Sequence, residues 1–458
     1  MTIRIQPLLV IIMALACLIL VLFPPAMLSQ EQTLALSLVV MAITLWATAL
    51  LPEYLTALLF FLAAMLLNVA DASVVFSGFT STAIWLIFSG MVLGAAIKDT
   101  GLGDRIAGTL GRNLEHSYPM LISGIVIACV VLGFFMPSSI GRAVMMVPIA
   151  MALADRCQLA SGSKGRTGVA LAAAFGCHLP TFAILPSNIP NMVLVGAAET
   201  IYGTSFNYTS YLLLHFPLLG VVKAALVIWL ILRFFPDQVK PHPSDFSQPS
   251  ALNSAQKLLI MVLSAALFFW MTDSFHGINP AWVGLSAAVF LLLPRVGVVD
   301  SKSFAAQVNL GILLFISAIL GLGAIINATG LGAMLGEALI NVLPLAPGRD
   351  FVNFISLILS AFLTGIFTTL PGVPAVLTPI AGDLAQQSGW SLEAVLMTQV
   401  IGFSTILLPY QSGPLVVAML LARESVISTL KLTLPLVAIT LLLLVPLDYL
   451  WWKFLGWI

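Results

Sequence analysis

The sequence predicts an all-α polytopic membrane protein with about 11 transmembrane helices plus two re-entrant helical hairpins, arranged in two inverted repeats. Three observations support this prediction: an apolar composition, a near-repeat that links the two halves, and a strong asymmetry of basic residues. The 458 residues are 60% apolar and only 8% charged, whereas average chains carry roughly a quarter charged residues. The mean hydropathy of +1.10 is typical of a chain that lies mostly in lipid.

The near-repeat joins residues 94–103, which read GAAIKDTGLG, with residues 323–332, which read GAIINATGLG. Both copies close a long apolar run. A polytopic chain whose halves resemble each other is the usual sequence trace of a transporter built from two structural repeats. Segments 101–116 and 330–346, which overlap or follow the two copies, mix apolar and polar residues and are expected to lie along the membrane interface as connecting arms.

Apolar runs of transmembrane length recur from end to end. The first run follows Arg4 and lacks a clear small-x-small cleavage site, so it is interpreted as a retained helix rather than a cleaved signal peptide. The predicted spanning helices are 7–29, 33–51, 54–70, 76–97, 167–202, 211–235, 258–273, 279–295, 304–328, 391–422 and 431–452, of which 167–202 and 391–422 are interrupted.

Two further apolar stretches, 118–155 and 351–388, are each too long for one helix and are broken near the middle. The breaks read MPSSIGR at 136–142 and TTLPGVP at 368–374. Each half is shorter than the roughly 20 residues that span a bilayer. Pro and Gly are tolerated at membrane depth where the freed backbone faces protein or water. These stretches therefore predict re-entrant helical hairpins.

The basic residues predict the orientation. With the N-terminus inside, 14 Lys and Arg residues fall on the cytoplasmic side, and only Arg349 and Lys453 fall outside. This bias follows the positive-inside rule. It predicts an inner (plasma) membrane protein with a cytoplasmic N-terminus and an external C-terminus. It also makes the two hairpins enter from opposite sides, as inverted repeats require.

The predicted organisation has five parts. The only stretch that resembles a linker is polar and rich in proline, and is expected to be a solvated tether between the repeats. The parts are an N-terminal transmembrane helix (1–30), a first repeat (31–235), a cytoplasmic linker (236–257), a second, inverted repeat (258–430) and a C-terminal transmembrane helix (431–458).

Composition and motifs exclude several classes of function. The net charge of zero gives no sign of a nucleic-acid partner, and the expected partners are the lipid bilayer and a small anion. The four cysteines form no CxxC pair, which disfavours a disulfide or metal site. A membrane-embedded enzyme would need a motif such as HExxH or GxSxG, and the sequence contains neither. We therefore expect a protein that is not an enzyme and has no cofactor.

Four polar breaks inside apolar segments are the candidate sites, because unwound backbone at membrane depth offers free N–H and C=O groups. Two are the hairpin tips, and two are the turns LPSNIPN at 185–191 and LPYQSGP at 408–414. A kink that merely eases helix packing is the alternative for each. The candidate substrate-binding residues are Ser138, Ser139, Arg142, Ser187, Asn188, Asn191, Thr369, Gln411 and Ser412.

These motifs resemble the divalent-anion:sodium symporter family of the wider ion-transporter superfamily, over roughly residues 30–425. The hydroxyl residues Ser138 and Thr369 each stand ten positions before a Pro-Ile pair, and each hairpin is followed by a helix broken at a polar turn. The resemblance implies a secondary active transporter that moves a small anion, a di- or tricarboxylate or sulfate, by alternating access. It also implies a homodimer.

The resemblance further implies sodium ions beside the substrate. Carried over by position, the family's Ser-Asn-Thr tips fall on 138–140 and 369–371, and its Pro/Asn-rich turns fall on the two broken helices. This chain lacks Asn in both tips and Thr at the third position of both, which argues against sodium coupling. The positions that would hold sodium are Ser138, Asn188, Thr369 and Ser412.

Arg142 stands two residues past Ile140, where the second helix of the first hairpin begins. A guanidinium at membrane depth usually faces a cavity and has a function, and its planar fork suits a pair of carboxylate oxygens. Arg142 is therefore predicted to be the counter-charge of the substrate. Transport would then depend weakly on sodium and be proton-coupled or an anion exchange. A structural ion pair or snorkelling to the interface is the alternative.

The remaining ionisable residues within apolar segments are given structural interpretations. His178 is interpreted as a hydrogen-bonded packing histidine, with a proton relay as the alternative, and Lys223 as a snorkelling or paired lysine. Because no acidic residue lies in the central part of a predicted helix, a cation/proton antiporter of the same superfamily is disfavoured. An arsenite transporter of that superfamily is a further alternative.

Overall fold

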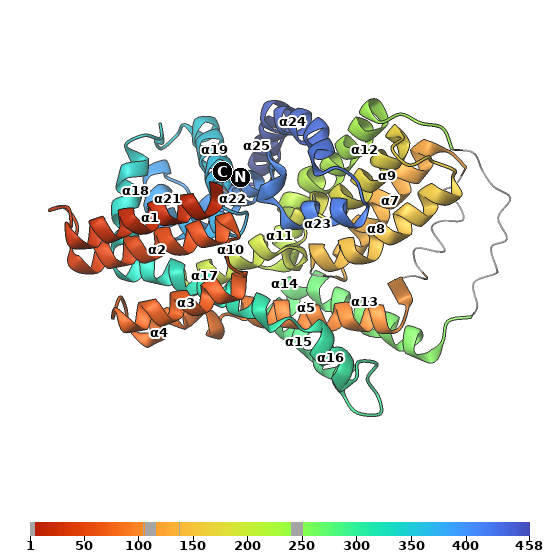
Figure 1. Cartoon of the computed structure of the whole chain (residues 1–458), viewed down its shortest axis with the longest axis horizontal. Coiled ribbons are helices and arrows are strands. Elements are labelled where there is room, and N and C mark those ends of the chain that lie inside the picture. The colour runs from red at the N-terminus through yellow and green to blue at the C-terminus, as the bar shows by residue number, and fades with distance from the viewer. Residues whose placement is uncertain (1–4, 104, 106–115, 137, 240–250) are drawn as a thin grey trace.

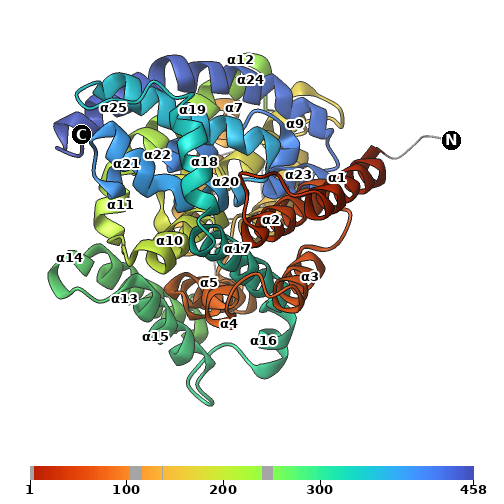
Figure 2. The same cartoon turned by 90° about the vertical axis from the view of Figure 1, so that its left-hand side faces the viewer.

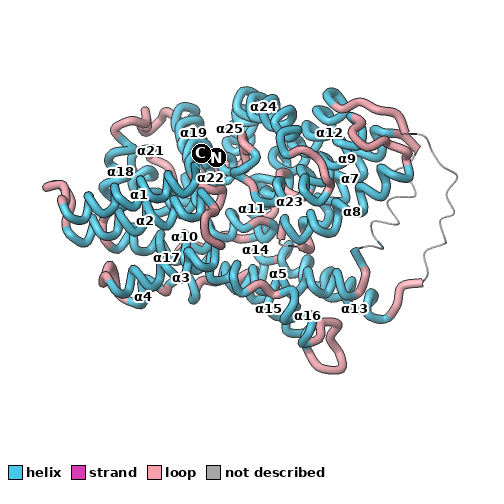
Figure 3. Tube along the Cα trace, viewed as in Figure 1, coloured by secondary structure: helices cyan, strands magenta, loops and turns pink. Residues whose placement is uncertain are grey.

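The computed structural model describes residues 5–103, 105, 116–136, 138–239 and 251–458 (Figure 1). Every regular element among these residues is a helix, as Figure 3 shows. The predicted all-α class is therefore confirmed. The first described helix, α1, and the last, α25, lie on opposite sides of the molecule in Figure 2.

The first half of the described chain contains α1 (Ile5–Leu22), α2 (Gln30–Thr48), α3 (Glu53–Leu66), α4 (Ala72–Val75), α5 (Thr82–Asp99), α7 (Tyr118–Gly133), α8 (Ser139–Arg156), α9 (Lys164–Gly176), α10 (Ile189–Tyr202), α11 (Tyr208–His215) and α12 (Lys223–Phe234). The second half contains α13 (Ser254–Met271), α14 (Asp273–His276), α15 (Pro280–Leu292), α16 (Ser301–Gln307), α17 (Leu310–Ala328), α18 (Leu331–Ile340), α19 (Asp350–Phe367), α20 (Gly372–Leu377), α21 (Ala381–Ser388), α22 (Leu392–Phe403), α23 (Gly413–Leu421), α24 (Leu430–Ile439) and α25 (Val445–Phe454).

Polar caps decide where many of these helices begin. Ser29 forms a capping box with Gln32 at the start of α2, so two of the free N–H groups at that terminus are satisfied. The side chains of Ser117, Ser163 and Ser391 accept backbone hydrogen bonds at the starts of α7, α9 and α22. Each cap stands at the residue before its helix, so the helix begins there with backbone N–H groups satisfied.

Seven helices in the described part of the chain are long and apolar enough to cross a membrane. Six of them match predicted spans, and the seventh is α19, the first arm of the second hairpin. Three more predicted spans are the shorter apolar helices α1, α3 and α15, and the last two are the broken pairs α9–α10 and α22–α23. The predicted fold class of about 11 crossings and two hairpins is confirmed.

Both hairpins form as predicted. In the first, α7 turns back into α8 near Met136, and the neighbouring Pro137 lies outside the described residues. In the second, α19 ends at Phe367 and the chain returns through α20 and α21. The division of the chain into five parts stays a prediction, and most of the linker (240–250) lies outside the described residues.

Two helix boundaries differ from the prediction. The span predicted at 304–328 is two helices, α16 and α17, because Asn309 interrupts the run and caps α17 through the N–H of Ile312 at 3.3 Å. The span predicted from residue 76 begins at Thr82, where Ser81 caps α5. Of the two predicted interface arms, 330–346 contains α18, whereas 101–116 falls largely outside the described residues.

The two halves pack in an inverted pattern. α7 packs on α9 as α19 packs on α22, while α8 packs on α23 and α20 packs on α10. The first hairpin, α7–α8, therefore contacts the broken helix of the second half, and the second hairpin contacts that of the first. In Figure 1 the two hairpins lie towards opposite ends of the molecule, with α10, α11 and α23 between them.

The broken helices form the centre of the protein. Residues 394–403 of α22 and 190–198 of α10 are buried without exception. By contrast, α1 exposes apolar side chains such as Ile11 and Ile19, more than half of whose surface is accessible. Apolar surface of this extent marks a face that meets lipid or protein rather than water. The polar breaks therefore lie in the part of the fold that is best shielded from the surroundings.

Candidate functional site

The first break separates α9 from α10, and the side-chain amide of Asn191 stabilises the turns within it. Two short turns, Pro180–Ala183 and Leu185–Ser187, join the helices. Asn191 Nδ2 donates to the carbonyl oxygens of Phe182 and Ile184, both at 3.0 Å. Each carbonyl also accepts from a second donor, Tyr211 Oη at 2.9 Å for Phe182 and Ser187 N at 3.0 Å for Ile184, so the backbone groups freed where the helix breaks are satisfied. Asn191, a predicted substrate-binding residue, thus supports the turn with its amide nitrogen.

The tip of the first hairpin docks against this break. Ser138 caps α8, and its Oγ accepts from the N–H of Gly141 at 3.1 Å. Ser139 Oγ donates to Asn188 Oδ1, and Asn188 Nδ2 donates to Thr181 Oγ1 at 3.0 Å. The structure therefore brings together Ser139 and Asn188, which are far apart in the sequence and were both predicted to bind substrate.

Arg142 lies at the centre of this junction and is fully buried. Its Nε and Nη2 atoms donate to Cys177 O at 3.1 and 2.8 Å, and its Nη1 atom donates to Ser187 O at 3.1 Å. All of its N–H groups therefore have acceptors within the protein. Its acceptors are the carbonyl oxygens of Met136, Cys177 and Ser187 and the hydroxyl oxygens of Ser139 and Thr181.

This geometry changes the role expected for Arg142. In this conformation its fork clamps the hairpin tip to the break and leaves no N–H group for a bidentate contact with a substrate. The alternatives of an ion pair with an acid and of snorkelling also do not describe it, because its partners are neutral and its side chain is buried. Its positive charge nevertheless lies beside Ser139, at the start of α8.

The second break is held by Gln411. Its Oε1 accepts from the N–H groups of Leu407 and Leu408 at 2.9 and 2.7 Å, and its Nε2 donates to Gly365 O at 2.7 Å. One amide thus ties the break to the first arm of the second hairpin. Ser412 caps α23 by accepting from the N–H of Leu415 at 3.3 Å. Both predicted residues lie in the break as expected.

Thr369 and Ser187 show how much of the predicted site is left without contacts. Thr369 is half-buried at the second tip, and its carbonyl accepts from Gly372 N at 2.9 Å. Ser187 Oγ and Asn191 Oδ1 are buried and have no hydrogen-bond partner among the described residues. Buried polar atoms are nearly always paired, so these two oxygens are the candidate-site atoms that can accept a hydrogen bond from a ligand.

The two breaks meet at the centre of the molecule. The ring of Phe182 in the first break lies 5.6 Å, centroid to centroid, from that of Phe403 at the end of α22. The start of α8 meets the start of α10 through Ser139 and Asn188, while α8 also packs on α23 and α20 packs on α10. Helix N-termini favour anions through their free N–H groups and their dipoles.

Lys223 adds a second cation on the side of the second break. It is fully buried, and its Nζ donates to Ser404 O at 2.8 Å and to Ser404 Oγ at 3.1 Å. It is thus paired rather than snorkelling. Ser404 is the C-cap of α22, just as Cys177, which binds Arg142, is the C-cap of α9. Each broken helix therefore has a cationic side chain on its negative C-terminal end.

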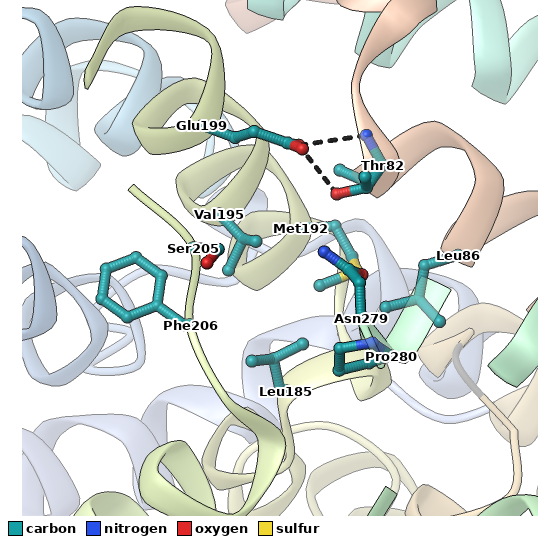
Figure 4. Close-up of a pocket in the computed structure, with 11 residues that line it drawn as sticks. Thr82, Leu86, Leu185, Met192, Val195, Glu199, Ser205, Phe206, Asn279 and Pro280 are labelled. Carbon is teal, nitrogen blue, oxygen red and sulfur yellow. Dashed lines mark hydrogen bonds between the residues drawn. The ribbon is translucent and has the colours of Figure 1, made fainter. Parts of the chain in front are cut away.

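A separate polar contact lies at the far end of α10 (Figure 4). Glu199 Oε2 accepts from Thr82 N at 3.0 Å and from Thr82 Oγ1 at 2.7 Å. The cavity beside it, lined also by Met192 and Asn279, has a volume of about 10 Å³. This is room for about one water molecule and not for a dicarboxylate. We therefore interpret the contact as a strut between α10 and α5.

The whole described architecture, from α1 to α25, matches a known family. The model of the sodium:sulfate symporter transmembrane region matches residues 5–458. The chain belongs to this family. The resemblance noted in the hairpins and broken helices is thereby confirmed, and membership of this symporter family makes the chain a multi-pass membrane transporter of anions.

Two relatives share about a quarter of their aligned residues with this chain. A membrane protein of Cupriavidus necator is 24% identical over 83% of this chain and 77% of its own length. The L-tartrate/succinate antiporter of Escherichia coli K12 is 26% identical over 74% of this chain and 72% of its own length. The relatives named for an activity are transporters, in agreement with the expectation that this symporter-family chain is not an enzyme.

Solved structures show the same fold at low identity. The YdaH transporter of Alcanivorax borkumensis superposes with a TM-score of 0.55 and 15% identity, covering 94% of this chain and 99% of that chain. MtrF of Neisseria gonorrhoeae gives a TM-score of 0.55 and 15% identity, covering 96% and 97%. At this identity the likeness concerns the fold alone.

One buried acid was missed by the sequence analysis. Asp448 lies near the end of the predicted helix 431–452 and was not considered as a residue within the membrane, yet its side chain is fully buried in α25. His178 is also buried, with its ring 4.8 Å from that of Phe182. The packing expected for His178 agrees with that contact, but neither ring nitrogen has the expected hydrogen-bond partner among the described residues. Asp448 needs an account of its own.

Proposed function

We propose that the chain is a secondary transporter that carries C4-dicarboxylates across the inner (plasma) membrane by alternating access. The observation that carries the proposal is the junction of the two breaks, where helix N-termini and buried cations surround polar side chains at the centre of an apolar protein. The relatives named L-tartrate/succinate antiporter support dicarboxylates over sulfate and citrate. The protein would act without a cofactor and without an enzymatic step.

Electrostatics at the junction favour an anion. Arg142 and Lys223 each contribute one positive charge, and Asp448 contributes one negative charge when it is ionised. Two cations less one anion leave a net charge of +1 in a region shielded from water. A charge in such surroundings acts more strongly than in solvent because screening is weak. A dicarboxylate would therefore be drawn to the junction, where Ser138 and Ser412 cap the helices.

We further propose that transport does not need sodium. Of the oxygens expected to bind sodium, Ser138 Oγ, Asn188 Oδ1 and Ser412 Oγ already accept hydrogen bonds from the protein. The carbonyl of Cys177 faces the guanidinium of Arg142. The guanidinium of Arg142 would thus balance the substrate's charge in place of a bound sodium ion. Few oxygens are left to replace the hydration shell of a sodium ion.

Counterflow in proteoliposomes tests this proposal. Vesicles loaded with unlabelled succinate should take up labelled succinate and L-tartrate in a saturable manner, and replacing external sodium with potassium should change the rate little. Protein-free vesicles are the control. Exchange of sulfate or citrate without exchange of dicarboxylates would overturn the substrate class, and no exchange of any anion would overturn the transport proposal itself.

The same assay separates the alternative functions. An arsenite transporter would move arsenite in place of dicarboxylates, and a cation/proton antiporter would dissipate a pH gradient on addition of sodium or potassium. The match to a family named for sodium and sulfate favours an anion over both. The homodimer implied by the family is likewise a proposal.

The orientation of the chain yields a prediction. Among basic residues, only Arg349 and Lys453 are assigned to the external side, so the positive-inside rule places the N-terminus in the cytoplasm and the C-terminus outside. Alkaline phosphatase fused after Ile458 should therefore be active in cells, and a fluorescent protein that folds only in the cytoplasm should stay dark there. The reverse pattern would refute the topology.

A further inference from the structure

Two long helices, one from each half, carry one buried charged residue each, of opposite sign, Lys223 and Asp448. The first runs from Tyr208 to Phe234 and the second from Val426 to Phe454, and both are apolar enough to span a membrane. Each contains a π-helical stretch, Phe216–Val222 in the first and Thr440–Leu444 in the second. Such stretches are rare and frequently lie at functional sites. α12 of the first helix packs on α24 of the second.

Lys223 is the residue that follows the first π-helical stretch. It is 1% exposed, and its ammonium group binds the carbonyl and the hydroxyl of Ser404. Ser404 ends α22 and lies seven positions before Gln411, which holds the second break. The charge on Lys223 therefore lies at the C-terminal end of α22, the broken helix that contributes half of the proposed substrate site.

Asp448 lies four residues after the end of the second π-helical stretch and is 0% exposed. It lies near the indole N–H of Trp452, but neither carboxylate oxygen has a hydrogen-bond partner among the described residues. The hydroxyl of Thr440 and both ring nitrogens of His215, whose ring lies 5.9 Å from that of Trp452, also lack partners in the described chain. An ionised carboxylate in such a place is costly unless it is compensated.

The compensating charge is that of Lys223. The two groups lie on helices that pack on each other through α12 and α24, but among the described residues they form no ion pair within 4.0 Å. Lys223 is committed to Ser404 instead. The carboxylate is therefore neither firmly paired nor exposed to water, and it can change its protonation state without breaking a hydrogen bond of the structure.

We propose that Asp448 is a proton-binding site that controls anion binding at the second break through Lys223 and Ser404. This proposal rests on the function proposed above. When the Asp448 carboxylate takes up a proton, it becomes a neutral acid, and the charge of Lys223 is no longer compensated. The net buried charge contributed by Arg142, Lys223 and Asp448 rises from +1 to +2, which matches a dicarboxylate dianion.

Linkage makes the effect reciprocal, so bound dicarboxylate also favours the protonated acid, and the two ligands move together. Release of the anion on the other side of the membrane then restores the ionised pair of Asp448 and Lys223 and frees the proton. The proton enters and leaves as H⁺ at one carboxylate oxygen, and no other bond is made or broken.

Other titratable groups on the neighbouring elements must be separated from Asp448. His178 interacts electrostatically with Lys223, and His215 faces Trp452 from α11. Most of the others stand near helix ends. The groups on elements packed against these two helices are Tyr118 and Cys129 on α7, Lys164 and Arg166 on α9, His178 after α9, Tyr208, Tyr211 and His215 on α11, Lys257 on α13, Asp273 and His276 on α14, Asp350 on α19, Tyr410 in the second break and Lys431 on α24, together with Arg233, Tyr449 and Lys453 on the two helices themselves.

The experiment measures L-tartrate binding and transport by the full-length protein in proteoliposomes from mildly acidic to mildly alkaline pH, where this substrate remains a dianion. The wild-type affinity should fall roughly tenfold from the acidic to the alkaline end, within the usual range of coupling between two sites. An imposed gradient, acidic outside, should drive uptake. Asp448→Asn, which mimics the neutral acid, should keep tight binding at every pH and lose gradient-driven uptake while it retains counterflow.

Matched variants make the result specific. Asp71→Asn removes a carboxylate that is exposed and makes no cap hydrogen bond, and it should leave the pH profile unchanged. Asp448→Glu should keep a pH-dependent affinity with a shifted midpoint. If wild-type protein exchanges L-tartrate without any effect of pH, or if His215→Gln rather than Asp448→Asn abolishes the pH dependence, the proton-site proposal is overturned. Absence of counterflow by the wild type would instead overturn the proposed function.

Discussion

Arg142→Lys should reduce transport by at least roughly tenfold although it preserves the charge of the side chain. Lysine offers a compact ammonium group, whereas the guanidinium of Arg142 reaches acceptors on three separate segments in fixed directions. Those segments are the hairpin tip at Met136, the end of α9 at Cys177 and the turn at Ser187. An ammonium cannot satisfy all of them, and each buried acceptor left unpaired costs about 1–3 kcal/mol.

The physical reason predicts which step fails. The hairpin tip and the broken helix are held in register by Arg142, so loss of the clamp should misplace Ser139 and Asn188, which hydrogen-bond across the same junction. Substrate affinity and turnover should both fall. Counterflow measured over a range of labelled succinate concentrations gives affinity and turnover separately. Thermal unfolding of the purified protein shows whether the variant remains folded.

Arg166→Lys is the matched control. Arg166, near the start of α9, binds Asp155 at the end of α8 with 18% of its side chain exposed, and a partly exposed ion pair contributes little. This variant should transport at close to the wild-type rate. A fully active Arg142→Gln variant, combined with a steep and saturable dependence on sodium, would contradict both the clamp and the proposal that fixed cations replace sodium.

Much of the fold could be predicted because its signals are local in the chain. The proline and glycine residues at 136–142 and 368–374 interrupt apolar runs, and the backbone chemistry of these residues acts wherever they occur. The same holds for the turns at 185–191 and 408–414, which the structure shows as the breaks between paired helices. Asn309 was passed over because a single polar residue in a long apolar run gives a weak local signal, although it caps α17.

The site could be predicted only in part, because the direction of a side chain and the groups that it contacts depend on residues far away in the sequence. The sequence indicated that Arg142 is within the membrane, but the carbonyls that surround it come from positions as far away as Ser187. Asp448 was passed over because it stands near the end of an apolar run, where acids usually meet water. Packing against the other helices encloses it instead, so that it is 0% exposed. No spacing rule within the chain pairs it with Lys223.

The two cations reveal a shared principle that neither residue shows alone. Arg142 reaches the C-cap of α9 from the hairpin, whereas Lys223 reaches the C-cap of α22 from a different helix. The two halves thus place a positive charge on equivalent helix ends with unrelated residues. Partial negative charge at a helix C-terminus is stabilised by a cation, and the solution can differ between halves whose overall packing is the same.

Gln411→Ala should weaken dicarboxylate binding by about ten- to a hundredfold and destabilise the second break. The change removes the acceptor of the Leu407 and Leu408 N–H groups and the donor to Gly365. Stranding buried backbone groups costs about 1–3 kcal/mol each, so the turn should rearrange and Ser412 should lose its position at the start of α23. Asn188→Ala should act alike on the first break, since Asn188 links Ser139 to Thr181.

Asn353→Ala is the control that separates binding from stability. Asn353 is a fully buried amide that bonds Ala346 and Ser388 at the opposite end of α19, away from the tip. Its loss should lower the unfolding temperature to a similar extent, but the affinity of the protein that remains folded should stay at the wild-type value. Gln411→Glu refines the comparison, because a carboxylate still accepts from Leu407 and Leu408 but cannot donate to Gly365. If Gln411→Ala and Asn188→Ala bind and transport succinate normally, the substrate site lies elsewhere in the molecule.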